Sequence, residues 1–328
     1  MKMLKKARIK IQGVALLCAV VSSACQSKND SEPVQRTPDA KLIGAAMAPQ
    51  AYLDRMRGNL KFVEGGSFQM GDFGPVHAPE KLPYSSDADN KPMHKVTLDS
   101  FSMSAYKITY EDHDVYAETA GVPKVGMDDF TKKRRHPRVA ASLTWQQARD
   151  YCQWLGQQLN LPMDIPTEAQ WEYSARNRGQ FWVVATDNGR LELGRNARSF
   201  DERSSYARQF GLTRLEPSLP LGSLPSNPLG LYDMMTEGQE WVLDWYAADY
   251  YAKSPEKNPL GPATGTHKVL RSSRGGSGEN LIMGDGLSIT RRNRMPNPAQ
   301  EPYLTKFPNP ADGTTSRCVV NRPMPVDH

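Results

Sequence analysis

Two stretches decide the fold of this chain: LTWQQARDYCQWL at residues 143–155 and IPTEAQWEYSAR at residues 165–176. Each contains a Thr-x-x-Gln capping box, which starts at Thr144 in the first stretch and at Thr167 in the second. In such a box the Thr hydroxyl accepts a backbone N–H of the first helical turn, and the Gln side chain reaches back to the cap. Apolar residues follow each box at helical spacing. The two stretches therefore predict two short amphipathic helices joined by a turn that contains Pro.

Further motifs follow one another along the chain. They are FVEGGSFQMG (62–71), PMHKVTL (92–98), NPLGLYDMM (227–235), RGGS (274–277) and SRCV (316–319). Together with the two helical stretches, these motifs resemble the formylglycine-generating enzyme family, also called the sulfatase-modifying factor family. The resemblance covers residues 60 to 323. It implies an α+β fold of the formylglycine-generating type, related in outline to C-type lectin folds, with one loop-rich domain, short strands and two signature helices.

The N-terminus has the pattern of a secretory signal, and we assign residues 1–24 to it. Five basic residues and no acidic one precede an apolar run, and small residues lead to Cys25. The apolar run is too short to span a membrane. Cleavage before Cys25 would leave a lipid-modified cysteine, as in bacterial lipoproteins, and Gln26 after it favours sorting to the outer membrane. The alternative is ordinary secretion after cleavage at Ala24.

Residues 25–58 are rich in Ser, Asn, Asp and Pro, which is typical of a flexible tether, and residues 42–57 could form a short helix leading into the domain. We therefore expect the folded domain to span residues 59–328, on the periplasmic side of the outer membrane. The chain has 41 basic and 36 acidic residues, and removing the five basic residues of the signal leaves 36 of each. Such a neutral mature chain gives no reason to expect a nucleic acid as partner.

The chain has four cysteines, of which Cys18 lies in the signal and Cys25 at the expected lipid site. Only Cys152 and Cys318 belong to the folded domain. In family members with oxidised cysteines the two matching positions form a disulfide, so the resemblance implies a bond between Cys152 and Cys318. An oxidising periplasm permits such a bond. The alternative is two buried, unpaired thiols.

This pairing would leave no thiol for catalysis. The family's oxidase uses two cysteines, placed before the C-terminal arginine-rich segment, to bind copper and activate oxygen, and soft thiolates suit copper(I). The matching stretch in this chain, residues 279–294, contains no cysteine, and Ser288 lies near one of the lost positions. We therefore expect no catalytic residue of the known type and no bound copper.

The resemblance also implies a calcium site in the enzymes, where an Asn of the central tryptophan motif contributes. That Asn corresponds to Glu237 in this chain. Asn196, Asp201 and Glu237 offer the hard oxygen ligands that calcium prefers, so they are candidate ligands. The alternative is that side-chain hydrogen bonds replace the ion.

Two weaker metal signals concern histidines. His77, His94 and His136 lack the spacing of a non-haem iron site, so we expect no iron. The EDHD sequence at residues 111–114 groups three carboxylates with an imidazole. Adjacent residues of a helix or strand point in different directions, which favours a solvated acidic turn over a metal site.

Six residues near the C-terminus are candidates for a binding cleft. They are Arg274, Ser277, Ser288, Arg291, Arg292 and Arg294. If the arginines line the cleft that binds peptide in the enzymes, they would favour carboxylate or phosphate groups. The alternative is that they hold loops in place through backbone carbonyls.

The sequence favours a membrane-anchored binding or assembly module over an enzyme. The missing cysteine pair and the tethered lipoprotein layout support this hypothesis. Lipoproteins of this family that serve gliding and secretion machines are similar in plan, so we expect an envelope protein or peptide as partner in an envelope or secretion complex. The alternative is a periplasmic metal-dependent oxidase, of the formylglycine-generating or siderophore-maturing type, that acts on a peptide.

Overall fold

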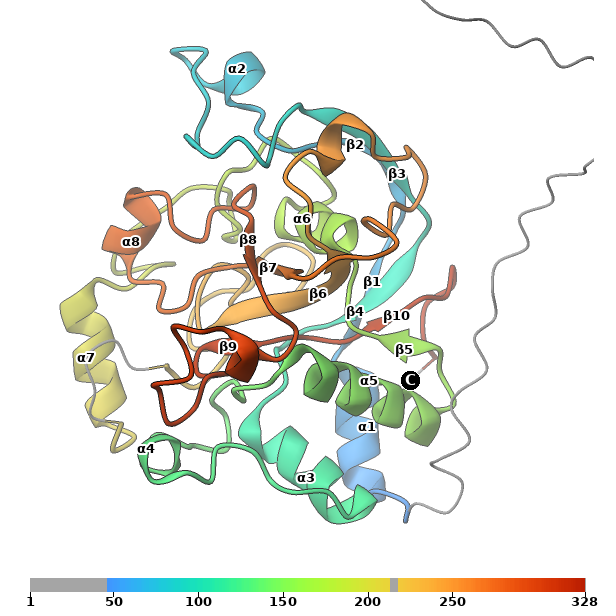
Figure 1. Cartoon of the computed structure of the whole chain (residues 1–328), viewed down its shortest axis with the longest axis vertical. Coiled ribbons are helices and arrows are strands. Elements are labelled where there is room, and N and C mark those ends of the chain that lie inside the picture. The colour runs from blue at the N-terminus through green and yellow to red at the C-terminus, as the bar shows by residue number, and fades with distance from the viewer. Residues whose placement is uncertain (1–45, 213–217, 328) are drawn as a thin grey trace, which may run out of the picture. The chain divides into compact units, whose positions relative to one another are not determined.

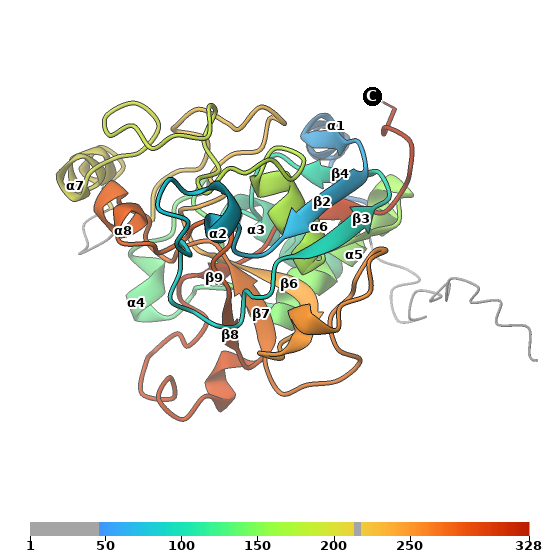
Figure 2. The same cartoon turned by 90° about the horizontal axis from the view of Figure 1, so that it is seen from above.

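The computed structural model describes residues 46–212 and 218–327 (Figures 1 and 2). The helices are α1 (Gln50–Gly58), α2 (Gly74–His77), α3 (Tyr110–Ala120), α4 (Asp129–Lys132), α5 (Trp145–Leu159), α6 (Glu168–Ala175), α7 (Phe200–Arg208) and α8 (Gly278–Ile282). The strands are β1 (Leu60–Val63), β2 (Gly66–Met70), β3 (His94–Leu98), β4 (Phe101–Ser104), β5 (Met163–Asp164), β6 (Gln239–Trp245), β7 (Lys268–Arg271), β8 (Arg292–Arg294), β9 (Thr314–Thr315) and β10 (Val319–Val320). The expected α+β architecture with short strands and long loops is confirmed.

The strands of the described residues form two four-stranded sheets and one hairpin. The first sheet has the order β1-β4-β10-β5, and its neighbours are antiparallel. The second has the order β8-β7-β6-β9, in which only β6 and β9 are parallel. β2 and β3 form the hairpin. Because β10 lies between β4 and β5, the last strand of the chain completes the sheet that the first strand begins.

Both signature helices begin at the capping boxes that the sequence predicts. The Thr144 hydroxyl accepts the Gln147 backbone N–H at 3.2 Å, and Gln147 Oε1 accepts the Thr144 N–H at 2.9 Å. Thr167 and Gln170 make the same pair of bonds, at 3.1 and 3.0 Å. The boxes fix where α5 and α6 start.

The prediction that both helices are amphipathic holds for α5 and is wrong for α6. All eight residues of α6 are buried, including Glu168 and Glu172. The helix lies between the β2–β3 hairpin and the second sheet and contacts both (Figure 2). A helix with a sheet on either side has no solvent-facing side, so its polar residues need partners inside the protein.

The folded unit begins earlier than residue 59. Helix α1 lies in the stretch expected to be a tether, but Tyr52 and Leu53 are buried and the helix contacts α5 and β1. The Tyr52 hydroxyl is 2.7 Å from the Tyr151 hydroxyl. Residues 1–45, with the expected signal and Cys25, lie outside the described residues. Within the described ranges, no helix combines the length and apolarity needed to cross a membrane.

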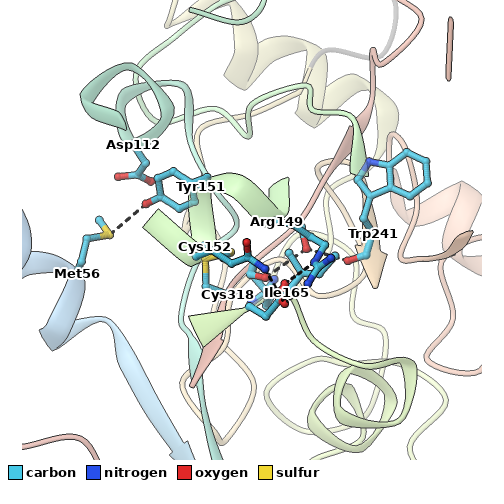
Figure 3. Close-up of a disulfide and its surroundings, with 12 residues drawn as sticks. Met56, Asp112, Arg149, Tyr151, Cys152, Ile165, Trp241 and Cys318 are labelled. Atoms are coloured by element: carbon cyan, nitrogen blue, oxygen red, sulfur yellow. Dashed lines mark hydrogen bonds and ion pairs between the residues drawn. A yellow bond between two sulfur atoms is a disulfide. The ribbon is translucent and has the colours of Figure 1, made fainter. Parts of the chain in front are cut away.

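A disulfide joins the middle of α5 to the residue preceding β10 (Figure 3). Cys152 and Cys318 are both buried, with their Cα atoms 5.5 Å apart, so the pairing that the resemblance implies is confirmed. The bond spans 166 residues of sequence. Closing so long a loop removes much conformational entropy from the unfolded chain, an effect worth about 4–5 kcal/mol.

Replacing both Cys152 and Cys318 with Ala should therefore lower the free energy of unfolding by about 4–5 kcal/mol in denaturant titrations. Adding a thiol reductant should destabilise the wild type by a comparable amount and leave the double variant unchanged. Equal stability of oxidised wild type and double variant would show that this bond contributes nothing to the folded state.

Candidate functional site

A buried network of charges lies where α6 meets the second sheet. Glu168 and Glu172 are one helical turn apart, so both side chains face β7. Arg271, at the end of β7, donates from Nη1 to Glu168 Oε1 at 2.7 Å and from Nη2 to Glu172 Oε2 at 2.9 Å. All three residues are almost wholly inaccessible to solvent. One guanidinium thus bridges two carboxylates in the core.

Two more arginines complete this network. Arg291 donates from Nε and Nη2 to the two oxygens of Glu168, at 2.7 and 3.1 Å. Arg176 donates from Nη1 to Glu172 Oε1 at 2.8 Å, and the Tyr251 hydroxyl donates to Glu168 Oε1 at 3.1 Å. Three guanidinium groups therefore surround two carboxylates, and each carboxylate oxygen of Glu168 has a cationic partner.

The electrostatics of the network follow from this arrangement. Burial alone would raise the pKa of Glu168, but Arg291 and Arg271 hold it below its usual value. Asp244 accepts the Glu168 backbone N–H at 2.7 Å, and burial together with the Glu168 charge raises its pKa to about 7. Both carboxylates of this buried network thus have arginine partners, and neither is an open charge.

The candidate residues predicted from the sequence do not include Glu168, Glu172, Arg176 or Tyr251. One signal was available: two Glu residues and an Arg recur at four-residue intervals among the Trp, Tyr and Ala residues of 168–176. Charges at helical spacing within an otherwise apolar stretch indicate paired, buried charges.

Three of the six candidate cleft residues are buried and make contacts inside the protein. Arg291 is buried in the network, and the Ser288 hydroxyl, also buried, donates to the Trp182 carbonyl at 2.7 Å. Ser277 caps α8, where its hydroxyl accepts the Asn280 N–H at 3.3 Å. These three residues hold the segment after β7 in place.

The other three candidates are nearer the surface. Arg274 is half-exposed and lies 2.8 Å from Asp312. Arg292 pairs with Asp87 at 3.0 Å. Arg294 is partly buried, and burial lowers its pKa. Arg274 and Arg292 each pair with a side-chain carboxylate, whereas the alternative expected backbone carbonyls as their partners.

The three candidate calcium ligands do not share one donor site. Both carboxylate oxygens of Glu237 are occupied by the buried Arg203, whose Nη2 lies 3.1 Å from Oε2. Asn196 Oδ1 accepts the Glu192 backbone N–H at 2.8 Å. Asp201 is exposed in the first turn of α7, whereas Arg203 of the same helix faces inward. A guanidinium therefore occupies the position beside Glu237, and the residues present do not fit a calcium ion.

The histidines are also dispersed. His94, in β3, packs its ring 4.6 Å from the Tyr251 ring, while His77 lies in α2 and His136 contacts Phe210. Among the described residues, no three His, Cys, Asp or Glu side chains are close enough together to hold a metal ion.

The stretch 111–114 is helical, not a solvated turn. It forms the start of α3, where Asp112 completes a capping box with Thr109 and the helix buries both Asp112 and His113. Burial disfavours the protonated ring and lowers the pKa of His113 to about 4. The charge of the nearby Asp114 raises this pKa, but by less than burial lowers it. The prediction of a turn was wrong because Asp112 is a helix-capping residue; of the four side chains only Glu111 is exposed.

Two recesses are formed by described residues alone. The larger has a volume of about 550 Å³ and lies between α1, the β4–α3 connection and residues 136–138. Its floor contains Ile108, Tyr151, Leu221 and Cys318. The smaller, of about 410 Å³, borders the N-terminus of α5 and includes His113. Neither of these two recesses is lined by a candidate cleft residue.

Comparison with known proteins identifies a family domain and several relatives. The sulfatase-modifying factor enzyme 1-like domain matches residues 49–303. The formylglycine-generating enzyme of Streptomyces coelicolor is 30% identical over 269 residues, which cover 69% of this chain and 81% of that enzyme. The serine/threonine-protein kinase pkn1 of Chlamydia pneumoniae is 30% identical over 266 residues, which cover 75% of this chain. The match covers 36% of that kinase-named protein, so this chain spans about a third of its length.

Two solved structures share the fold. PvdO from Pseudomonas aeruginosa has a TM-score of 0.58 and 22% sequence identity, covering 80% of this chain and 93% of its own. Treponema denticola variable protein 1 has a TM-score of 0.56 and 19% identity, covering 80% of this chain and 95% of its own. At these identities the similarity concerns the fold and carries no statement about activity.

Replacing Arg271 with Met should destabilise the protein by about 3–5 kcal/mol, because two carboxylates would lose a partner in the dry interior. Denaturant unfolding measures the change. The matched control is Lys253→Met, which removes an exposed ion pair with Asp249 and should leave the unfolding midpoint unchanged. A fully stable Arg271→Met variant would contradict the role given to the network.

His113 should make the protein less stable in acid. The unfolded chain binds a proton on this ring below its ordinary pKa of 6.5, whereas the folded chain does so only near pH 4. The unfolded state therefore binds more protons between these values, so the free energy of unfolding falls as the pH drops, by about 3 kcal/mol at pH 4. His113→Phe should flatten this dependence in denaturant unfolding measured from pH 7 to pH 4, and His77→Phe, at an exposed site, should not. Identical slopes for His113→Phe and wild type would refute the assignment.

Proposed function

This chain belongs to the sulfatase-modifying factor family, and from that premise we propose that it uses the family fold as a binding and assembly module rather than as an oxidase. One observation carries the proposal: the two cysteines of the folded domain are consumed by a buried disulfide. The remaining two, Cys18 and Cys25, precede the described residues. We further propose that Cys25 carries a lipid and holds the domain on the periplasmic side of the outer membrane.

The loss of thiols bears directly on the chemistry. By resemblance, the family's oxidase holds copper(I) with two thiolates, and a hydroxyl is a hard, neutral donor that suits this ion poorly. Ser288 lies near one of the missing cysteines, but its hydroxyl is buried and donates to a backbone carbonyl. A structural role for Ser288 accounts for its contacts.

The charged side chains of the same region also have partners inside the protein. Arg271 and Arg291 could otherwise hold an anionic substrate, but both are buried and paired with Glu168. A bidentate arginine that already binds a carboxylate in a dry site has little capacity left for a second anion.

The segment after β7 instead presents apolar side chains to solvent. Ile282 and Met283, at the end of α8, are 65% and 85% exposed. Leu193, 51% exposed, packs beside the start of the same helix, where a Cβ added to Gly278 would lie 2.0 Å from its side chain. Adjacent exposed apolar side chains of this size are typical of a protein contact surface. We propose that an envelope protein binds here.

The alternative function is a metal-dependent oxidase that acts on a peptide. His94 favours it, because its Nε2 is buried and has no hydrogen-bond partner within the described ranges. The acidic groups near His94 are Glu168 and Glu172, which arginines already hold. The donor set for a redox metal is thus incomplete at this position.

An activity test separates the two functions. The purified full chain, supplied with copper(I), oxygen and a cysteine-containing peptide, should form no formylglycine aldehyde by mass spectrometry, whereas the Streptomyces coelicolor enzyme serves as positive control. Elemental mass spectrometry should find less than stoichiometric copper or iron. Aldehyde formation, or about one redox metal per chain that His94→Ala removes, would overturn the proposal in favour of the oxidase.

Crosslinking tests the contact surface itself. A photoreactive residue at Met283 should give a discrete crosslinked product in intact cells, and one at the exposed Lys257 should not. The double variant Ile282→Asp and Met283→Asp should abolish the complex and keep the fold. A chain that stays monomeric with the probe at Met283 would remove the basis of the assembly role.

A further inference from the structure

We propose that the larger recess binds the C-terminal end of a peptide, taking an apolar last side chain into its floor and the terminal carboxylate against Arg138. This site lies apart from the contact surface at α8, so it goes beyond the proposed function and can be tested separately. Three features of the recess support this site: its shape, the state of each charge around it and the hydrogen-bonding groups at its edge.

The floor is apolar and firmly held. Ile108, Tyr151, Leu221 and Cys318 are each at most 3% exposed. Cys318 is bonded to α5 through the disulfide, and the Ile108 backbone bonds to Ser316 and Ala141 at 2.8 Å each. A volume of about 550 Å³ is within the range of ligand pockets. The space is preformed, so an apolar side chain could enter it without reorganising the core.

Most charges around the recess are already compensated. Lys107 is buried, 3.4 Å from Glu240, and donates to two backbone carbonyls. Arg55 pairs with Glu111 at 2.7 Å and with Asp112 at 3.4 Å. None of these groups therefore offers an open charge to a ligand.

Arg138 is different. It is exposed, and it uses one nitrogen, Nη2, to donate to the Leu221 carbonyl at 3.1 Å. No carboxylate of residues 46–212 or 218–327 lies within ion-pair distance of its guanidinium. One hydrogen bond fixes the side chain at the edge of the recess, and the remaining N–H groups are available for a carboxylate, the anion that fits a guanidinium best.

His136 adds a neutral donor beside Arg138. Its Nδ1 accepts the Arg138 backbone N–H at 3.2 Å, so in the neutral ring the proton sits on Nε2. Burial and the nearby Arg138 lower the pKa of His136, which keeps the ring neutral at pH 7. A carboxylate at this edge would meet a cation and an N–H donor together.

The side-chain amide of Asn59 can form hydrogen bonds with a peptide backbone. It ends α1 and lines the recess, and its side-chain amide makes no hydrogen bond in the part of the chain that the structure describes. An amide offers both a donor and an acceptor to a peptide unit. An apolar floor, a carboxylate partner and a free amide could together contact the side chain, the carboxylate and the backbone of a peptide C-terminus.

The test uses fluorescent pentapeptides of four alanines followed by Phe, Leu or Val, with fluorescence polarisation on the full chain. At least one peptide with a free C-terminal carboxylate should bind, and its C-terminally amidated form should bind about tenfold more weakly or worse. Arg138→Gln should weaken the free acid by a similar factor. Arg208→Gln, which removes an exposed arginine of α7, is the matched control and should have no effect.

Two further arms complete the experiment. Asn59→Trp should fill the recess and abolish binding, with the unfolding midpoint confirming that the variant folds. Phenylpropionate tests the source of the carboxylate: failure to compete at millimolar concentration supports recognition of the peptide backbone, and full competition would replace the peptide with any apolar carboxylate. Equal affinity for acid and amide, an unaffected Arg138→Gln variant or no binding of any peptide would overturn the proposal. The double variant Ile282→Asp and Met283→Asp should keep peptide binding. Loss of the contact surface at α8 can therefore be distinguished from loss of the peptide site.

Discussion

The carboxylates of Glu168 and Glu172 connect segments that lie far apart in the sequence. Arg271 is 103 residues from Glu168, and Arg291 is 123 residues from it. The arginines also bond to backbone carbonyls beyond the network: Arg176 reaches Gln69 of β2, and Arg291 reaches Asp89. The hairpin, the second sheet and the loop before β8 are thus positioned relative to one buried helix. Removing any member leaves an uncompensated charge in a medium that solvates it poorly.

This network and the disulfide stabilise different halves of the interior. Cys152 and Cys318 belong to the apolar cluster around α1, α3 and α5, whereas Trp171 and Tyr251 belong to the cluster around α6 and the β2–β3 hairpin. The two devices also differ in physics. The covalent bond acts mainly by restricting the unfolded chain. The buried charges add little net stability over apolar residues of similar volume, but the loss of one partner leaves the other charge buried and uncompensated.

Much of the fold could be predicted from local signals and from the family resemblance, and much of the site could not. The capping boxes at Thr144 and Thr167 fixed the starts of both signature helices, because a cap involves only neighbouring residues. The burial of α6 escaped prediction, since periodicity reports one apolar face and not what covers the other. The pairing of Arg291 with Glu168 and of Arg203 with Glu237 depends on contacts across long separations, which the residue types alone do not specify. The larger recess escaped for the same reason, because α1, Ile108, Arg138 and Leu221 meet only in the folded chain.

The disulfide has a mechanical consequence. A pulling force applied from the N-terminal side enters the described residues through α1 and β1. β1 is paired with β4 and β4 with β10, while Cys318, next to β10, is bonded to α5, against which α1 packs. The segments that receive this force are therefore connected to one another both by strand pairing and by a covalent bond. The bond between Cys152 and Cys318 would hold α5 and β10 together even after the strand pairs had separated.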